Sequence, residues 1–259
     1  FALAPSTMDI SETLTRFASF VWHLPDNDIV ARCNAMVYCD YFPEENRGVS
    51  WSSSVRPNVS AEVLSFFESD PSDVLFYTYA VLSSRTYLDT FEPVLFGPSS
   101  PEEPPRIPIS RDASLRIQVV NLGKEIAHCE QEDYHIDVLQ ELRLSWPPNI
   151  PEFKLEKVSI DVENGVISLR GSNHEVATIE HIRPEILSLK ISGHEVVAKW
   201  LRDRKYSYLR RTFRPGDFEM LVRLISRIAK QQQLIREVDR ILELLFNLDS
   251  LCIPPTANE

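Results

Sequence analysis

Seven Lys and Arg side chains stand against a single acidic one in residues 199–214 (KWLRDRKYSYLRRTFR). Cationic side chains at this density bind anions, and the guanidinium fork of arginine suits phosphate oxygens and guanine edges. Tyr206 and Tyr208 lie among the charges, and tyrosines contact the sugars and phosphates of nucleic acids. These residue types indicate phosphate or nucleic-acid binding rather than bond-breaking chemistry.

The positive charge is local, because the whole chain of 259 residues carries a net charge of −11. Between Lys190 and Arg236, twelve Lys and Arg residues face four Asp and Glu residues, whereas the remainder has a balance of −19. This asymmetry favours an anionic partner for the basic part. A basic, solvated amphipathic helix explains the charge equally well. Overall acidity does not exclude DNA binding, since salt makes phosphate contacts short-range.

If this stretch binds DNA, its cations are expected to meet phosphates and its tyrosines to touch sugar or base. The neighbouring Val197, Trp200 and Leu201 are predicted to form the buried side of a helix. The candidate DNA-binding residues are Lys199, Arg202, Arg204, Lys205, Tyr206, Tyr208, Arg210, Arg211 and Arg214.

The sequence contains no recognisable catalytic or cofactor motif. It has no GxxxxGK[ST], GxGxxG, HExxH or GxSxG pattern, and its four cysteines form no CxxC pair. We therefore expect no catalytic residue, no metal and no cofactor in this chain, and reduced thiols in a cytoplasmic protein. No run of eighteen apolar residues is present, so we expect no membrane span.

The elements that would position the basic stretch follow from periodicity. Ser60 and Ser72 are predicted N-caps, and apolar spacing predicts helices near 61–68, 72–91, 112–131 and 195–202, with a long closing helix at 217–246. Alternating residues on both sides of Asn164-Gly165 predict a hairpin. The predicted fold class is α+β: mixed helices, a small antiparallel sheet with a hairpin, and a long C-terminal helix. We expect two lobes, a mixed and mainly helical one at 1–150 and a hairpin, strand and basic helical one at 151–259.

Two stretches resemble elements of one protein family. The first motif falls on Phe76, Tyr79, Ala80, Val81, Leu82, Ser84 and Tyr87, followed by Pro105, Arg106, Ile107 and Pro108. The second motif falls on Ile191, Gly193, Val196, Trp200, Leu201, Arg204 and Lys205. In order and spacing they are similar to the C-terminal specificity domain of type ISP restriction-modification enzymes and related adenine DNA methyltransferases.

The resemblance implies a target-recognition module for double-stranded DNA that takes part in phage defence. In that family one polypeptide joins the module to a nuclease, a helicase-like ATPase and an adenine methyltransferase. We expect such domains as partners, on the same or a neighbouring polypeptide, and this chain to be the detached specificity domain or a stand-alone relative, not an enzyme by itself. The alternative is a protein–protein interaction module that uses the basic stretch and the C-terminal helix. A fragment without retained activity is a third reading.

Overall fold

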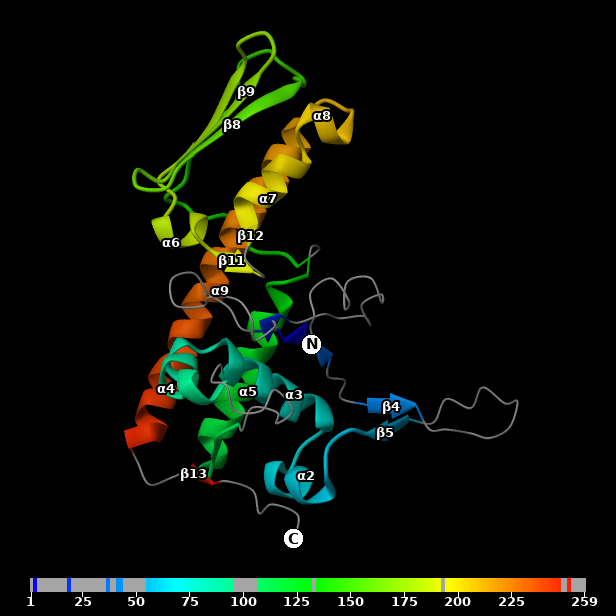
Figure 1. Cartoon of the computed structure of the whole chain (residues 1–259), viewed down its shortest axis with the longest axis vertical. Coiled ribbons are helices and arrows are strands. Elements are labelled where there is room, and N and C mark those ends of the chain that lie inside the picture. The colour runs from blue at the N-terminus through cyan, green and yellow to red at the C-terminus, as the bar shows by residue number, and fades with distance from the viewer. Residues whose placement is uncertain are drawn as a thin grey trace, which may run out of the picture. The chain divides into compact units, whose positions relative to one another are not determined.

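The computed structural model of the chain describes four long segments and several short strands. They are residues 55–95, 107–131, 134–191 and 194–247, with short strands at 2–3, 18–19, 36–37, 41–43 and 251–252. The chain divides into two compact units: unit 1 contains residues 1–8, 16–132 and 232–259, and unit 2 contains 9–15 and 133–231. The predicted α+β class is confirmed (Figure 1). The division into lobes 1–150 and 151–259 stays a prediction.

Unit 1 is built mainly from helices. They are α2 (Ala61–Phe67), α3 (Pro71–Ser83), α4 (Arg85–Leu95), α5 (Ala113–His128) and the second half of α9 (Pro215–Asn247). Ser60 caps α2 as predicted, because its hydroxyl accepts the N–H of Val63 at 3.4 Å. The predicted N-cap Ser72 is wrong, because α3 begins at Pro71 after Asp70; proline fits the first helical position since it has no N–H to satisfy.

The long helix predicted over residues 72–91 is wrong, since the chain breaks at Ser84 into α3 and α4. Ser84 has an extended backbone, and its hydroxyl accepts the N–H of Tyr87 at 3.2 Å. The same hydroxyl donates to Asp239 Oδ1 of α9 at 2.5 Å, and this carboxylate also accepts the N–H of Thr86. Two otherwise unpaired N–H groups at the start of α4 are thereby satisfied, which stabilises the break.

The first family motif lies in the core of unit 1. Tyr79, Leu82 and Tyr87 are buried, and α3 packs against α5 so closely that the backbone carbonyl of Phe76 faces Gly123. Buried Tyr77 donates to the Pro108 carbonyl at 3.0 Å, and burial raises the pKa of its phenol to about 12. The motif therefore specifies packing in this unit.

Short strand pairs complete this unit. β1 pairs antiparallel with β2 and β3, β4 pairs with β5, and β6 pairs with β13. Their bounds are β1 (Ala2–Leu3), β2 (Ala18–Ser19), β3 (Met36–Val37), β4 (Tyr41–Pro43), β5 (Val55–Pro57), β6 (Ile109–Ser110) and β13 (Leu251–Cys252).

Unit 2 contains an antiparallel sheet in the order β7-β10-β9-β8 (Figure 1). Its strands are β7 (Arg143–Ser145), β8 (Leu155–Asp161), β9 (Val166–Gly171) and β10 (Val176–Glu180). The predicted hairpin is confirmed as β8–β9, with Gly165 at φ 64°. A Cβ on Gly165 would lie 2.0 Å from the Ile182 carbonyl oxygen, so both the backbone angle and the space require glycine.

One face of this sheet is buried under helices. The elements after the sheet are α6 (Pro184–Leu187), β11 (Lys190–Ile191), β12 (His194–Glu195), α7 (Val196–Asp203), α8 (Tyr206–Leu209) and the first half of α9. Ile167, Leu169 and Ile179 from the sheet pack with Val197 of α7 and Leu221 of α9. Among the described residues, no helix is both long and apolar enough to cross a membrane.

The close approach of α3 and α5 gives a test of the fold. A methyl group on Gly123 would lie 2.1 Å from the Phe76 carbonyl oxygen. We expect Gly123→Ala to lower the free energy of unfolding by roughly 1–3 kcal/mol, because overpacking forces the helices apart. Gly216→Ala, in the first turn of α9, is the matched control, since its methyl group would meet nothing within 4 Å. Equal stability of the two variants in chemical denaturation would contradict the packing described.

Candidate nucleic-acid interface

The basic stretch occupies α7, α8 and a linking segment, residues 210–214, that leads into α9. Val197 and Leu201 of α7 are fully buried, as predicted, and Trp200 packs at the edge of the same core. After α7, residues 206–209 form the helical turn α8. This short turn ends because Arg210 adopts the left-handed conformation, at φ 57°.

The linking segment is fixed to the start of β8 by a backbone bridge. Phe153 N–H donates to Phe213 O at 3.0 Å, and Phe213 N–H donates to Phe153 O at 2.7 Å. The two rings lie 5.8 Å apart between centroids, and the indole of Trp146 packs on both. A buried aromatic cluster thus holds the segment that carries three of the predicted arginines.

Arg214 closes the same junction from outside. Its Nε lies 2.9 Å from a carboxylate oxygen of Glu152, the residue before Phe153. Hydrogen bonds from the Thr212 side chain and from Arg214 lower the pKa of Glu152. Both members of the ion pair are largely exposed, so this bridge orients Arg214 more than it stabilises the fold.

Arg211 stabilises the start of α9 through Asp217. Its guanidinium donates two hydrogen bonds of 2.6 Å to Asp217, and the Asp217 carboxylate also accepts the backbone N–H of Arg214 at 2.9 Å. Burial opposes ionisation of Asp217, but these bonds and the positive charge of Arg211 outweigh it and lower the pKa of the carboxyl. The carboxylate in the first turn also complements the positive end of the helix dipole. Arg211 is therefore a positioning residue.

Three further candidates have partners within unit 2. Lys199 forms an ion pair with Asp203 one turn later on α7. The Arg204 guanidinium stacks on the Trp200 ring, with 3.5 Å between its Cζ and the ring centroid. Tyr206 receives the ammonium group of Lys154 over its ring at 4.8 Å. With Arg211 and Arg214, five of the nine predicted residues are engaged inside the protein.

Of the other four predicted residues, Arg202, Tyr208 and Arg210 are exposed and Lys205 is half-buried. Within the described segments no ion pair involves Arg202, Lys205 or Arg210, and the side chain of Tyr208 projects outward, with the residue 67% exposed. Arg210 is exposed in a left-handed conformation that disfavours any residue other than Gly, Asn or Asp. Backbone strain of this kind recurs at functional positions.

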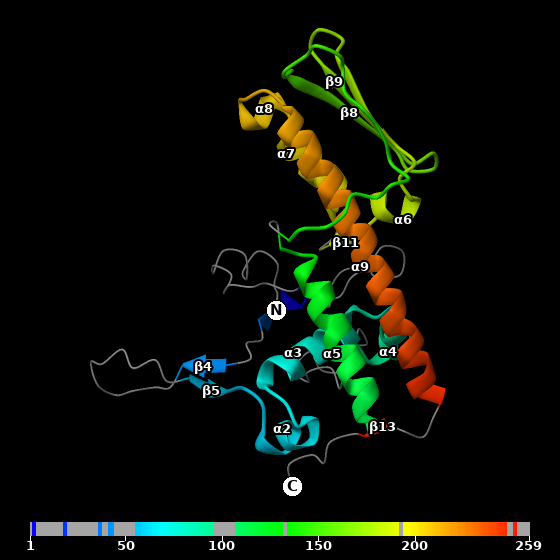
Figure 2. The same ribbon diagram turned by 180° about the vertical axis from the view of Figure 1, so that it is seen from behind.

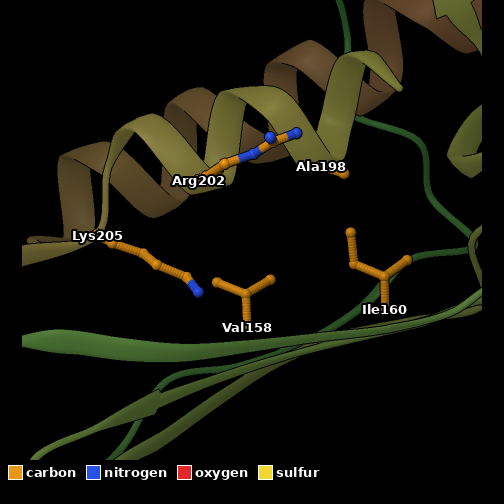
Figure 3. Close-up of a pocket in the computed structure, with 5 residues that line it drawn as sticks. All are labelled: Val158, Ile160, Ala198, Arg202 and Lys205. Carbon is orange, nitrogen blue, oxygen red and sulfur yellow. The ribbon is translucent and has the colours of Figure 1, made fainter. Parts of the chain in front are cut away.

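Arg202 and Lys205 border a groove between α7 and β8 (Figure 3). Its volume is about 300 Å³, and its lining consists of Val158, Ile160, Ala198, Arg202 and Lys205. The two β8 side chains form an apolar floor that points toward the helix, Lys205 extends toward Val158, and Arg202 lies along α7. No acidic side chain lines the groove, so it presents unopposed positive charge beside an apolar surface. Val158 and Ile160 are not among the site residues predicted from the sequence, although the alternation of the hairpin places both on one face.

The remaining predictions for the site concern metals and the family motifs. In the part of the chain that the structure describes, no group of three or more His, Cys, Asp or Glu residues is placed to hold a metal ion. Pro105, Arg106 and Gly193 of the motifs lie outside the described residues. Motif residues Trp200 and Lys205 have different surroundings, the first at the core and the second at the groove.

Comparison with known families agrees with this architecture. Residues 7–236 match the model of the Type ISP C-terminal specificity domain, and the chain belongs to this family. Its fold is similar to part of the ATP-dependent Type ISP restriction-modification enzyme LlaBIII bound to DNA, with a TM-score of 0.52 and 17% identity. That match covers 78% of this chain and 13% of the LlaBIII chain.

A second solved structure is more distant. It is a nuclease-deletion mutant of the Type ISP restriction-modification enzyme LlaGI in complex with a DNA substrate mimic. Its TM-score is 0.44 at 16% identity, covering 78% of this chain and 15% of that one. No curated protein matches the chain in sequence.

The buried carboxylate at the start of α9 generates a pH-dependent prediction. Asp217→Asn should lower the free energy of unfolding by roughly 1–3 kcal/mol at pH 7, because hydrogen bonds to a charged group are lost. Since the pKa of Asp217 is lowered in the folded state, its stabilisation is complete above the ordinary carboxyl pKa of about 4 and fades as the pH falls further.

Denaturant unfolding of both proteins between pH 7 and pH 3 tests this. The difference between wild type and variant should be constant at neutral pH and should narrow below about pH 4. Glu219→Gln, which changes an exposed carboxylate of α9, is the control and should leave stability almost unchanged. A difference that widens on acidification would contradict the ion pair.

Proposed function

We propose that this chain is a sequence-specific DNA target-recognition domain that contacts duplex DNA through α7, α8 and the groove beside β8. The observation that carries the proposal is that only part of the cations of residues 199–214 have partners within the protein. Some of them are held by partners within the protein, whereas exposed Arg202 and Arg210 and half-buried Lys205 form no ion pair in the described segments. Unpaired, exposed cations on a rigid frame suit a polyanionic ligand.

The groove suits DNA in its details. Arg202 and Lys205 supply charge for phosphate oxygens, and an arginine can also pair with a guanine edge. The apolar floor of Val158 and Ile160 suits the C5-methyl group of thymine or the face of a sugar. Exposed Tyr208 of α8, the helical turn that follows Lys205, offers a ring and a hydroxyl.

The wider assembly follows from the family. We propose that this domain works as part of a cytoplasmic restriction-modification enzyme whose nuclease, helicase-like and adenine-methyltransferase domains lie on the same or a neighbouring polypeptide. Catalysis would then be supplied by those domains, and this chain would select the DNA sequence. LlaBIII, a Type ISP enzyme solved bound to DNA, supports this placement through the shared family.

The alternative, a protein-interaction module, loses one of its two supporting features. Its C-terminal helix was expected to offer an apolar face to a partner helix. Most apolar side chains of α9 are instead buried within the chain's own units: Leu221, Val222, Ile225, Ile228, Ala229, Leu234, Val238, Leu242 and Leu245. Met220 and Leu244 are exposed, but apolar residues exposed singly are ordinary on a soluble surface.

The double variant Arg202→Gln/Lys205→Gln tests the groove. We expect weaker duplex binding and a plot of log affinity against log salt that is shallower by about 2, since each phosphate contact contributes about 0.9. Fluorescence anisotropy with a labelled duplex at several salt concentrations measures both. The matched control is Arg236→Gln/Arg240→Gln, which removes the same charge from exposed positions on α9. Equal effects of the two variants would show that only net charge matters.

Arg210 allows affinity to be separated from stability. Glycine accepts φ 57° more readily than arginine, so Arg210→Gly should keep or raise the thermal midpoint while weakening duplex binding. His174→Gly, at φ 66° in the β9–β10 turn, is the control that relieves a left-handed residue without removing an arginine. Anisotropy and thermal unfolding would be measured on both. Unchanged affinity in Arg210→Gly would remove this residue from the interface.

A further inference from the structure

The sheet of unit 2 has a second face, on the side away from α7 and α9, which we call the outer sheet face. Strand register places side chains on it in rows that cross the strands. One row contains Lys157, Arg170 and Val176, and the next contains Ser159, Ser168, Thr178 and Ser145. The outer sheet face is therefore mainly hydrophilic in these two rows, and Lys157 lies on it at the edge strand β8.

Lys157 and Arg170 are direct neighbours across β8 and β9. Both residues are exposed, and within the described segments neither takes part in an ion pair. Like charges directly opposite on a sheet destabilise it, so folding alone does not favour this pair. A destabilising pair of this kind is expected where function, such as binding an anion, requires both charges.

The neighbouring row adds hydrogen-bonding groups without charge. Ser159, Ser168 and Thr178 stand in register over three adjacent strands, and Ser145 of β7 extends the row. Short hydroxyl side chains beside cations are a frequent composition of surfaces that contact DNA sugar and phosphate. Two carboxylates of this face, Asp161 of β8 and Glu180 of β10, lie beyond the hydroxyl row from Lys157, and Glu180 is paired with Arg143 at 3.9 Å.

We propose that the outer sheet face, led by Lys157 and Arg170, is a second surface for the DNA phosphate backbone. This inference rests on the proposed function and extends it. β8 is the edge strand, with Lys205 and Arg202 on its inner side and Lys157 on its outer side. Figure 1 and its reverse view, Figure 2, both show α7 and α8 beside β8, with the other side of this strand pair uncovered by helices of unit 2.

Such an arrangement holds DNA along the β8 edge with cations on both flanks. The major groove of B-form DNA admits a β-ribbon, and cations on either side of the ribbon then face the two phosphate backbones. The outer cations would position the domain, because phosphate contacts carry no direct sequence information. Loss of the outer cations should therefore weaken binding to all duplexes alike.

The variant Lys157→Gln/Arg170→Gln tests the proposal, with Arg236→Gln/Arg240→Gln as the charge-matched control. We expect the salt dependence of duplex affinity to become shallower by about 2 in the first variant and to change less in the control. The thermal midpoint should stay equal or rise, since a like-charged pair is removed. In the wild type, bound duplex should protect Lys157 from amine acylation, as measured by mass spectrometry.

The outcomes separate this proposal from the function on which it rests. If wild type binds duplex and the outer variant binds with the same salt dependence, the outer sheet face is not a DNA surface and the α7–β8 interface stands. If wild type binds no duplex even at low salt, the proposed function itself fails. If polyglutamate, used as an acidic protein mimic, protects Lys157 and duplex does not, the surface serves an acidic protein and the proposal is overturned.

Discussion

The backbone bridge between Phe153 and Phe213 is the constraint on which the surface of unit 2 depends. Its two hydrogen bonds join the segment after α8 to the residues before β8, which are 60 positions apart in sequence. Because Trp146 and both phenylalanine rings bury this junction, it lies in low dielectric, where backbone hydrogen bonds are costly to break. Glu152, Thr212 and Arg214 then add polar contacts around it. The bridge therefore fixes the segment that carries Arg210 relative to the start of β8.

The seven cations of residues 199–214 do not all have to contact a ligand, because some of them stabilise the fold of unit 2. Arg211 and Asp217 stabilise the start of α9, and Arg204 covers Trp200. Arginine suits these tasks because its planar group forms paired hydrogen bonds and stacks on rings while staying charged. An arginine used in this way still adds positive potential to the surface, so it aids attraction of an anion without touching it.

Much of the fold was predictable from local sequence. The Asn164-Gly165 hairpin, the Ser60 cap and the long C-terminal helix depend on neighbours within a few residues. The break at Ser84 was not predictable in this way, because the carboxylate that stabilises it, Asp239, is 155 residues away in sequence.

The residue types of the site were predictable from the sequence, but which of its cations are held by partners inside the protein was not. Residue type alone marks Arg202 and Arg211 as equal candidates, and only the carboxylate of Asp217, placed by the turn into α9, makes them different. The pairing of Lys157 with Arg170 could have been predicted from the sequence, because the hairpin turn fixes the register and the alternation assigns each side chain to a face. It was missed because these two cations lie 13 positions apart and form no run in the sequence.

The acidity of the whole chain fits a recognition role once charge is considered by position. A protein with a net charge of −11 is repelled by DNA at long range, but salt screens that repulsion beyond about 10 Å. Contacts made by a few exposed cations survive such screening because they act at hydrogen-bonding distance. A module of this kind would bind poorly to arbitrary duplex and would depend more on base and groove contacts for affinity. Concentrating positive charge along one strand edge, in an otherwise acidic molecule, therefore favours discrimination over indiscriminate binding.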